Sequence, residues 1–415
     1  MEFAWFAAGA ASLALAAGAM ATAQNRTDGG TVRYWMSAET MSGLPGMSGG
    51  GQPSPAAIAR MMMGGRDQGP GFSHLLTLQI GSPRRPAGAP NAEHAPPPGL
   101  QAGPVLPLVT PAPTERPRPS GEPWERGGGN VRGRLLIFWG CGEHAPAGQP
   151  IEIDLSRIAA GQVPPELGSL PFQPMQPPNP GNSTTYGEWP NSRDDRGRIV
   201  IPATGSLVGD HVVRGNYTPD IRFTLAQGQD FLAPITLTSN TRAPSGAVPL
   251  AWQPVPNAQG YFLMSFGARD NNTMVIWTSS ASRLAQIAAF DYLAPAEAAR
   301  LVQQRVLLPP SATECTVPAE VSAGTQGASL MMTAFGPEAN FSYPERPPRA
   351  PRGWAPDWTV KLRTRSAYFG LLGTDLAAMM RGQDGARQDR NNDQGRERRR
   401  RRNPLGGILG RVVGD

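Results

Sequence analysis

Lysine is almost missing from this chain of 415 residues. Lys361 is the only lysine, and arginine supplies the other permanently charged basic side chains. The bias is typical of a GC-rich genome, which also raises the frequency of alanine, glycine and proline. Selection of arginine for bidentate contacts with phosphate or carboxylate is the alternative, because a guanidinium presents a planar fork of donors.

Apolar residues are scarce as well. They make up 39% of the chain, whereas 50 glycines and 45 prolines account for more than a fifth of it. This composition approaches that of low-complexity proteins. We therefore expect folded parts with real cores, separated by segments that cannot bury enough apolar surface to fold.

Cysteine and histidine are too few for most metal chemistry. The chain has two cysteines and four histidines, whereas a closed zinc site needs four ligands. The lysine-bearing phosphate loop and the H-E-x-x-H helix of zinc proteases do not occur. The sequence thus predicts no cofactor, and an enzyme is the less favoured class.

The first residues have the character of an export signal. Residues 3–23 form an uncharged apolar stretch that closes with Ala21-Thr22-Ala23, a small-x-small cleavage pattern, before Gln24. No basic residue precedes the stretch, and Glu2 has the wrong sign. We expect a signal peptide over 1–23 and a periplasmic or outer-envelope location, with retention of the segment as a membrane anchor as the alternative.

Short apolar runs bounded by glycine and proline predict a mainly β protein with two β-sandwich-like domains. The first spans 24–242 and pairs 73–80 with 134–139; a patch at 105–109 docks as an edge strand. Asp154 or Ser156 caps one helical turn. Strands are expected at 31–36, 73–80, 134–139, 151–155, 198–201, 211–213, 221–225 and 231–238. Low-complexity loops are expected at 41–71, 83–130 and 163–191.

The second expected domain spans 243–371. It contains a hairpin of 261–266 and 274–278, strands at 315–321 and 329–335, and a helical insertion near 295–305 that starts at a proline. The last strand, 359–366, alternates basic with apolar residues, so we expect its basic face to meet solvent. The stretch PLAWQPVPNAQGYFLMSF within 245–280 resembles the opening strands of fibronectin type III-like sandwiches, which implies a fold but no function.

Other strings resemble exported proteins of GC-rich Gram-negative bacteria. They are LLIFWGCGEHA, GPEANFSYP and WAPDWTVKLR. The resemblance carries no known activity, so it implies a location and leaves the function open.

The C-terminal residues 372–415 are expected to form a disordered, arginine-rich tail. Arg398, Arg399, Arg400, Arg401 and Arg402 form an unbroken run of positive charge, followed by a short apolar end. Such a run can hold anionic lipid or lipopolysaccharide; a solvated tail without a dedicated partner is the alternative. Nucleic acid is a poor candidate, because the tail has no interleaved aromatic residues.

Reactive side chains are most concentrated directly after the apolar run at 134–139. Cys141 and Cys315 are expected to form a disulfide, with two separately buried thiols as the alternative. The segment Cys141, Glu143 and His144 could instead provide a nucleophilic thiol or part of a metal site.

Two functional hypotheses remain. The favoured one is a non-enzymatic binding or scaffolding protein of the cell envelope, with an unknown envelope component as partner. The rival is a periplasmic hydrolase, in which two carboxylates from distant parts of the chain meet in one pocket. The carboxylates considered for it are Glu143, Asp154, Glu188, Asp194 and Asp195.

Overall fold

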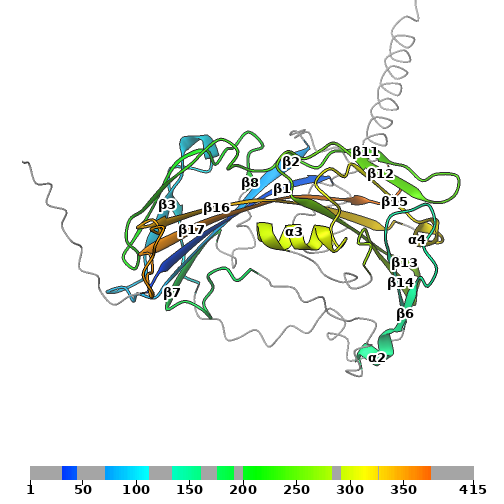
Figure 1. Ribbon diagram of the computed structural model, residues 1–415, viewed down its shortest axis with the longest axis horizontal. Helices are drawn as coiled ribbons and strands as arrows, with labels where there is room; N and C mark the ends of the chain where they lie inside the picture. Colours follow the sequence, from blue (N-terminus) through cyan, green and yellow to red (C-terminus); the bar gives the residue numbers. More distant parts are fainter. Residues whose placement is uncertain are drawn as a thin grey trace, which may run out of the picture.

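A computed structural model of the protein describes residues 30–43, 71–111, 133–159, 175–190, 200–282, 291–325 and 327–374. These residues are mainly β, as the sequence predicts. Figure 1 shows one wide, arched sheet that carries smaller sheets on its convex side and a helix on its concave side. The expected signal peptide and the tail beyond residue 374 lie outside the described residues.

The large sheet has ten strands in the order β6-β5-β14-β13-β16-β17-β1-β2-β7, with β8 also pairing with β2. The pairs β1·β17 and β5·β14 are parallel, and the other pairs are antiparallel. The strands are β1 (Val32–Gly43), β2 (Phe72–Ser82), β5 (Arg134–Trp139), β6 (Ile151–Asp154), β7 (Thr185–Trp189), β8 (Val200–Ile201), β13 (Gly260–Asp270), β14 (Thr273–Thr278), β16 (Ser329–Tyr343) and β17 (Trp358–Leu371).

This order corrects two expectations about organisation. The boundary placed at residue 242 does not separate two sheets, because β1 lies beside β17 and β5 lies beside β14. The strands at 73–80 and 134–139 share the sheet but do not pair with each other. Alternation of apolar residues identifies a strand and its buried face, but it does not identify the partner strand.

The second sheet covers one half of the convex side and contains four strands in the order β10-β9-β3-β4. The structure corrects the expectation of low-complexity loops at 83–130 and 163–191. The first stretch contains β3, a turn of 3-10 helix and β4, and the second contains β7. The patch at 105–109 docks as expected, since Val109 bridges Glu188. The new elements are β3 (Ala92–Ala95), η1 (Pro98–Leu100), β4 (Leu106–Pro107), β9 (Gly209–Gly215) and β10 (Ile221–Leu225).

A buried chain of polar side chains crosses the core between these two sheets. The Tyr34 hydroxyl contacts Nδ1 of His94, whose Nε2 lies 3.0 Å from Nδ1 of His211. The other ring nitrogen of His211 donates to the Leu207 carbonyl at 2.7 Å. The His211 ring also stacks on Phe223. Because each ring nitrogen has a partner, the two histidines can remain neutral in an apolar core.

The third sheet covers the other half of the convex side and consists of β11 (Leu237–Asn240), β12 (Val248–Trp252) and β15 (Glu314–Val317). Trp252 packs on Tyr261 of β13, with ring centroids 5.4 Å apart. The hairpin of β13 and β14 is confirmed, and its turn is held by the Asp270 carboxylate, which accepts the Asn272 N–H at 2.8 Å. The short helix α2 (Leu155–Ala159) is preceded by Asp154, which accepts the Ser156 N–H at 2.8 Å as a cap.

On the concave side, α3 (Pro295–Gln303) packs against β13 and β16 (Figure 1). It begins at the expected proline, and Ala298 and Leu301 face Phe262 and Phe335 of the sheet. A shorter helix, α4 (Ala319–Ser322), follows β15. Within the described ranges, no helix has the length and apolar character needed to cross a bilayer.

Acidification should destabilise this fold through its buried histidines. Burial lowers the pKa of His74, His94 and His211 from the usual 6.5. The unfolded chain therefore binds protons at a higher pH than the folded chain does. The free energy of unfolding should fall as the pH drops below about 6.5, by up to about 1.4 kcal/mol per pH unit for each histidine. Denaturant titrations between about pH 7.5 and about pH 5.5 measure this slope, and a flat profile would contradict burial of neutral rings.

Candidate functional site

The basic face of β17 is covered, contrary to the expectation that it meets solvent. Lys361, Arg363 and Arg365 lie on the concave side of the sheet, and Arg363 is only 5% exposed. Asp291 and Tyr292, which precede α3, pack over Arg363 and Arg365. Strand alternation correctly places the three cations on one face, but it cannot reveal that a segment some seventy residues earlier in the sequence covers them.

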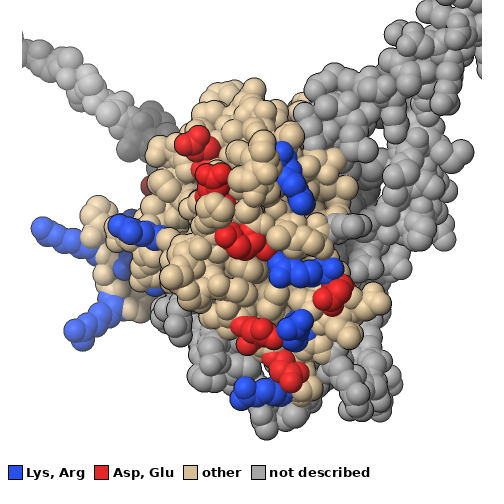
Figure 2. All heavy atoms as spheres, turned by 90° about the vertical axis from the view of Figure 1, so that its right-hand side faces the viewer, with Lys and Arg blue, Asp and Glu red and all other residues tan. Residues whose placement is uncertain are grey.

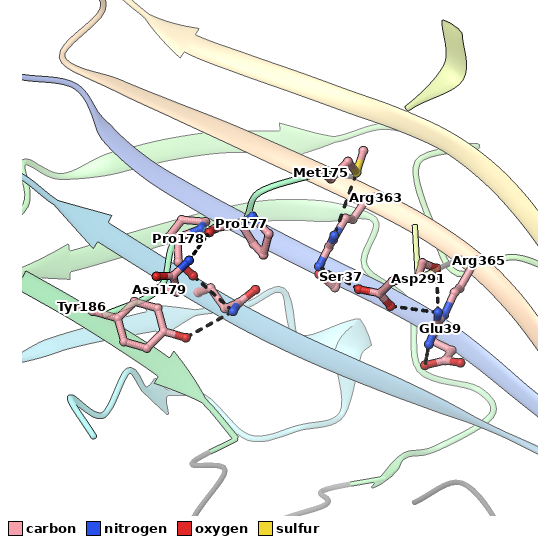
Figure 3. A network of polar contacts seen from close by, with 11 residues as sticks. Ser37, Glu39, Met175, Pro177, Pro178, Asn179, Tyr186, Asp291, Arg363 and Arg365 are labelled. Atoms are coloured by element: carbon pink, nitrogen blue, oxygen red, sulfur yellow. Dashed lines mark hydrogen bonds and ion pairs between the residues drawn. The ribbon is translucent and has the colours of Figure 1, made fainter. Parts of the chain in front are cut away.

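Arg365 contacts two carboxylates that differ in their exposure to solvent (Figure 3). Its guanidinium contacts Glu39 of β1 at 3.0 Å and Asp291 at 2.9 Å. The Glu39 side chain is 14% exposed, whereas that of Asp291 is 68% exposed. Burial lowers the pKa of Arg365, but the negative charge of nearby groups, including Glu39, outweighs burial and raises it overall. Arg365 is therefore a permanent cation.

Arg363 has weaker compensation for its charge. Its Nε donates to the Ser37 hydroxyl at 2.7 Å, and the nearest carboxylate oxygen, on Asp291, lies 3.9 Å away. The sulfur of Met175 lies 3.9 Å from Nη1 (Figure 3). The guanidinium also sits 4.2 Å from the centre of the Tyr292 ring, a cation–π contact. Burial lowers the pKa of Arg363, with partial opposition from Tyr292 and Asp291.

The row of cations continues toward the start of β17. Lys361 forms an ion pair with Glu338 of β16 and lies 5.5 Å from the centre of the Trp35 ring. Arg33, from β1, lies 5.7 Å from the same ring. We call Trp35, Glu39, Tyr292, Glu338, Asp291, Arg33, Ser37, Lys361, Arg363 and Arg365 the concave cluster.

A second set of polar contacts joins β2 to β7 on the same side of the sheet (Figure 3). The Gln79 amide donates to the Tyr186 hydroxyl at 3.2 Å and to the Pro178 carbonyl at 3.3 Å. The Tyr186 hydroxyl in turn donates to Glu188 at 2.8 Å. Burial raises the pKa of Tyr186 well above its usual value. This hydroxyl is therefore a donor and not a base at neutral pH.

The chemistry of the concave cluster favours holding charge over transforming a substrate. Burial raises the pKa of Tyr292, so its hydroxyl keeps its proton at neutral pH. The Glu39 carboxylate is engaged by the Arg365 guanidinium in a charge-assisted contact. Arg363, in contrast, is a buried cation whose nearest carboxylate oxygen lies 3.9 Å away, so its charge is only partly compensated.

The segment around Cys141 is structural. Cys141 and Cys315 form the expected disulfide, with Cα atoms 5.2 Å apart, so the thiol is not free to act as a nucleophile or a metal ligand. The backbone carbonyl of Glu143 accepts the Ala319 N–H at 3.0 Å. His144 lies 3.1 Å from Glu320, which also accepts the Ala145 N–H at 2.9 Å. The disulfide therefore removes the free Cys141 thiol on which the hypothesis of a reactive or metal-binding segment depends.

Charges at this end of the molecule alternate in sign. Figure 2 shows acidic and basic side chains interspersed over the face that carries β6 and α4. Arg134 and Glu152 pair there at 3.3 Å. Among the residues that the structure describes, no group of three or more histidine, cysteine or acidic side chains could hold a metal ion.

The dispersed carboxylates of the hydrolase hypothesis are only partly described. Asp154 caps α2, Glu188 accepts from Tyr186, and Glu143 lies exposed in the loop after β5. Asp194 and Asp195 lie outside the described residues, as do the five arginines at 398–402.

Comparisons with known proteins add no identification. Neither the models of protein families nor the curated proteins contain a match to this chain.

The two carboxylates on Arg365 provide a matched pair of substitutions. Glu39→Gln should lower the free energy of unfolding by roughly 3 kcal/mol, because it leaves a largely buried guanidinium without its buried partner. Asp291→Asn should cost less than about 1 kcal/mol, because the Asp291 side chain is mostly exposed. Urea unfolding of both variants measures the difference. Equal losses would show that the concave cluster is open to water.

Proposed function

We propose that this chain is an exported, non-enzymatic binding or scaffolding protein of a bacterial cell envelope. The observation that carries the proposal is the disulfide between Cys141 and Cys315. Disulfides persist in oxidising compartments such as the periplasm and are rare in the reducing cytosol. The apolar residues 3–23 and the cleavage pattern at Ala21-Thr22-Ala23 support the same location.

The disulfide links two of the sheets. It ties the loop after β5, near one edge of the large sheet, to β15 of the third sheet, across 174 positions of sequence. On the chain-entropy model, closing such a loop stabilises by as much as about 5 kcal/mol. Glycine loses the most conformational entropy on folding, so a chain with 50 glycines gains from such a bond.

The charges favour binding over catalysis. The carboxylates of the concave cluster are paired with Lys361 or Arg365, so they are poorly placed to act as an acid and base pair. In this proposal the run of arginines at 398–402 contacts anionic lipid or lipopolysaccharide. The identity of the envelope component bound by the folded part stays open.

An intact-mass measurement on protein isolated from the envelope of its host tests the proposal. We expect a chain that begins at Gln24 and cysteines that react with an alkylating reagent only after reduction. A chain recovered from the cytosol with two freely labelling thiols would overturn export. An uncleaved chain in the membrane fraction, with its disulfide intact, would instead support an anchored envelope protein.

A further inference from the structure

The turn between β16 and β17 gathers positive charge at one end of the large sheet. It carries three exposed arginines, Arg346, Arg349 and Arg352, against two carboxylates, the exposed Glu345 and the half-buried Asp357. The turn spans residues 344–357, where the hairpin of β16 and β17 reverses at one end of the sheet (Figure 1). Positive side chains therefore dominate the tip of this hairpin.

Two neighbouring segments extend this basic end. The chain enters β1 directly beside the turn, because the Thr31 hydroxyl donates to the Pro356 carbonyl at 2.8 Å. β2 is the next strand, and at this same end it is followed by Arg84 and Arg85. Five arginines thus lie at the end of the sheet where β1 begins. We call this surface, residues 30–31, 83–85 and 344–357, the basic end.

These arginines differ from those of the concave cluster in how their charge is compensated. Arg365 contacts two carboxylates within the fold. No arginine of the basic end forms an ion pair with a described carboxylate, although Glu345 stands in the same turn. Arg84 is half-buried, but the other four arginines are exposed, so their charge is directed to the solvent.

The turn is rigid and carries aromatic rings among its arginines. Tyr343 is 58% exposed and stacks on Trp358, and Arg346 lies 5.9 Å from the centre of the Trp354 ring. The backbone N–H of Trp354 donates to the Pro351 carbonyl at 3.1 Å. Five prolines restrict the remaining backbone, at 344, 347, 348, 351 and 356. A rigid surface loses little conformational entropy when it binds.

The basic end is also the part of the fold nearest in sequence to the apolar residues 3–23. Seven steps of chain separate residue 23 from Gly30, the first residue described. Seven residues span at most about 25 Å. In the anchored form, in which residues 3–23 are retained in a bilayer, the basic end is within reach of the headgroups on that side.

We propose that the basic end docks on an anionic lipid surface. Arg346, Arg349 and Arg352 meet the headgroup phosphates, which match the fork of donors on a guanidinium. Tyr343 and Trp354 provide the amphipathic rings that favour the boundary between lipid and water. The proposal rests on the envelope location proposed above, and it concerns a different surface from the arginines at 398–402.

Sedimentation with lipid vesicles tests the proposal on the full chain. Vesicles of phosphatidylcholine and phosphatidylglycerol in equal parts are compared with vesicles of phosphatidylcholine alone. The protein carries alanine at 398–402 throughout, so that the tail does not mask the folded surface. The variant R346A/R349A/R352A should bind the anionic vesicles roughly 100-fold more weakly, since each arginine near a charged membrane contributes roughly a five-fold effect.

A control variant has the same change in charge at other places. R134A/R157A/R305A alters exposed arginines of β5, α2 and the loop after α3, and it should change binding by less than about three-fold. R346K/R349K/R352K should keep most of the binding, which separates lost charge from a lost fold; circular dichroism confirms folding. Equal losses in the first two alanine variants would overturn the proposal, as would equal binding to both kinds of vesicle. Neither result depends on the intact-mass measurement, which tests export alone.

Discussion

The parallel pairing of β1 with β17 is the constraint on which the rest of the structure depends. Twelve residue pairs, from Val32 with Trp358 to Gly43 with Phe369, join the first described strand to the last. Without this pairing, β1, β2, β7 and β8 would separate from the other six strands of the large sheet, because no other described strand pair connects the two groups. Parallel neighbours need a crossover connection, and here almost the entire chain forms it.

The same strand pair serves two different environments. On the convex side, Tyr34 belongs to the buried polar chain with His94 and His211. On the concave side, Glu39 neutralises Arg365 directly across the strand pair. The period of two in a β-strand allows one sequence to meet both needs. A shift of register by one residue would place the charges in the apolar core.

Local signals were sufficient for individual elements and insufficient for their arrangement. The strand at 221–225, the turn at Asp270 and the helix that begins at Pro295 follow from alternation, turn chemistry and the preference of proline for the first helical turn. The sequence patterns do not reveal β3 and β7, because proline and glycine dominate their surroundings. For the site, the basic row of β17 was visible in the sequence. Its partners were not, since Glu39 and Asp291 contact it only through the fold.

Hydrogen exchange measured by mass spectrometry tests the pairing of β1 with β17 most directly. Amides of β1 and β17 should exchange slowly and through the same opening event, because each strand protects the other. A β1 that exchanges rapidly while β16 and β17 remain protected would contradict the account. In that case the sheet would end at β17, and neither the concave cluster nor the basic end would exist as described.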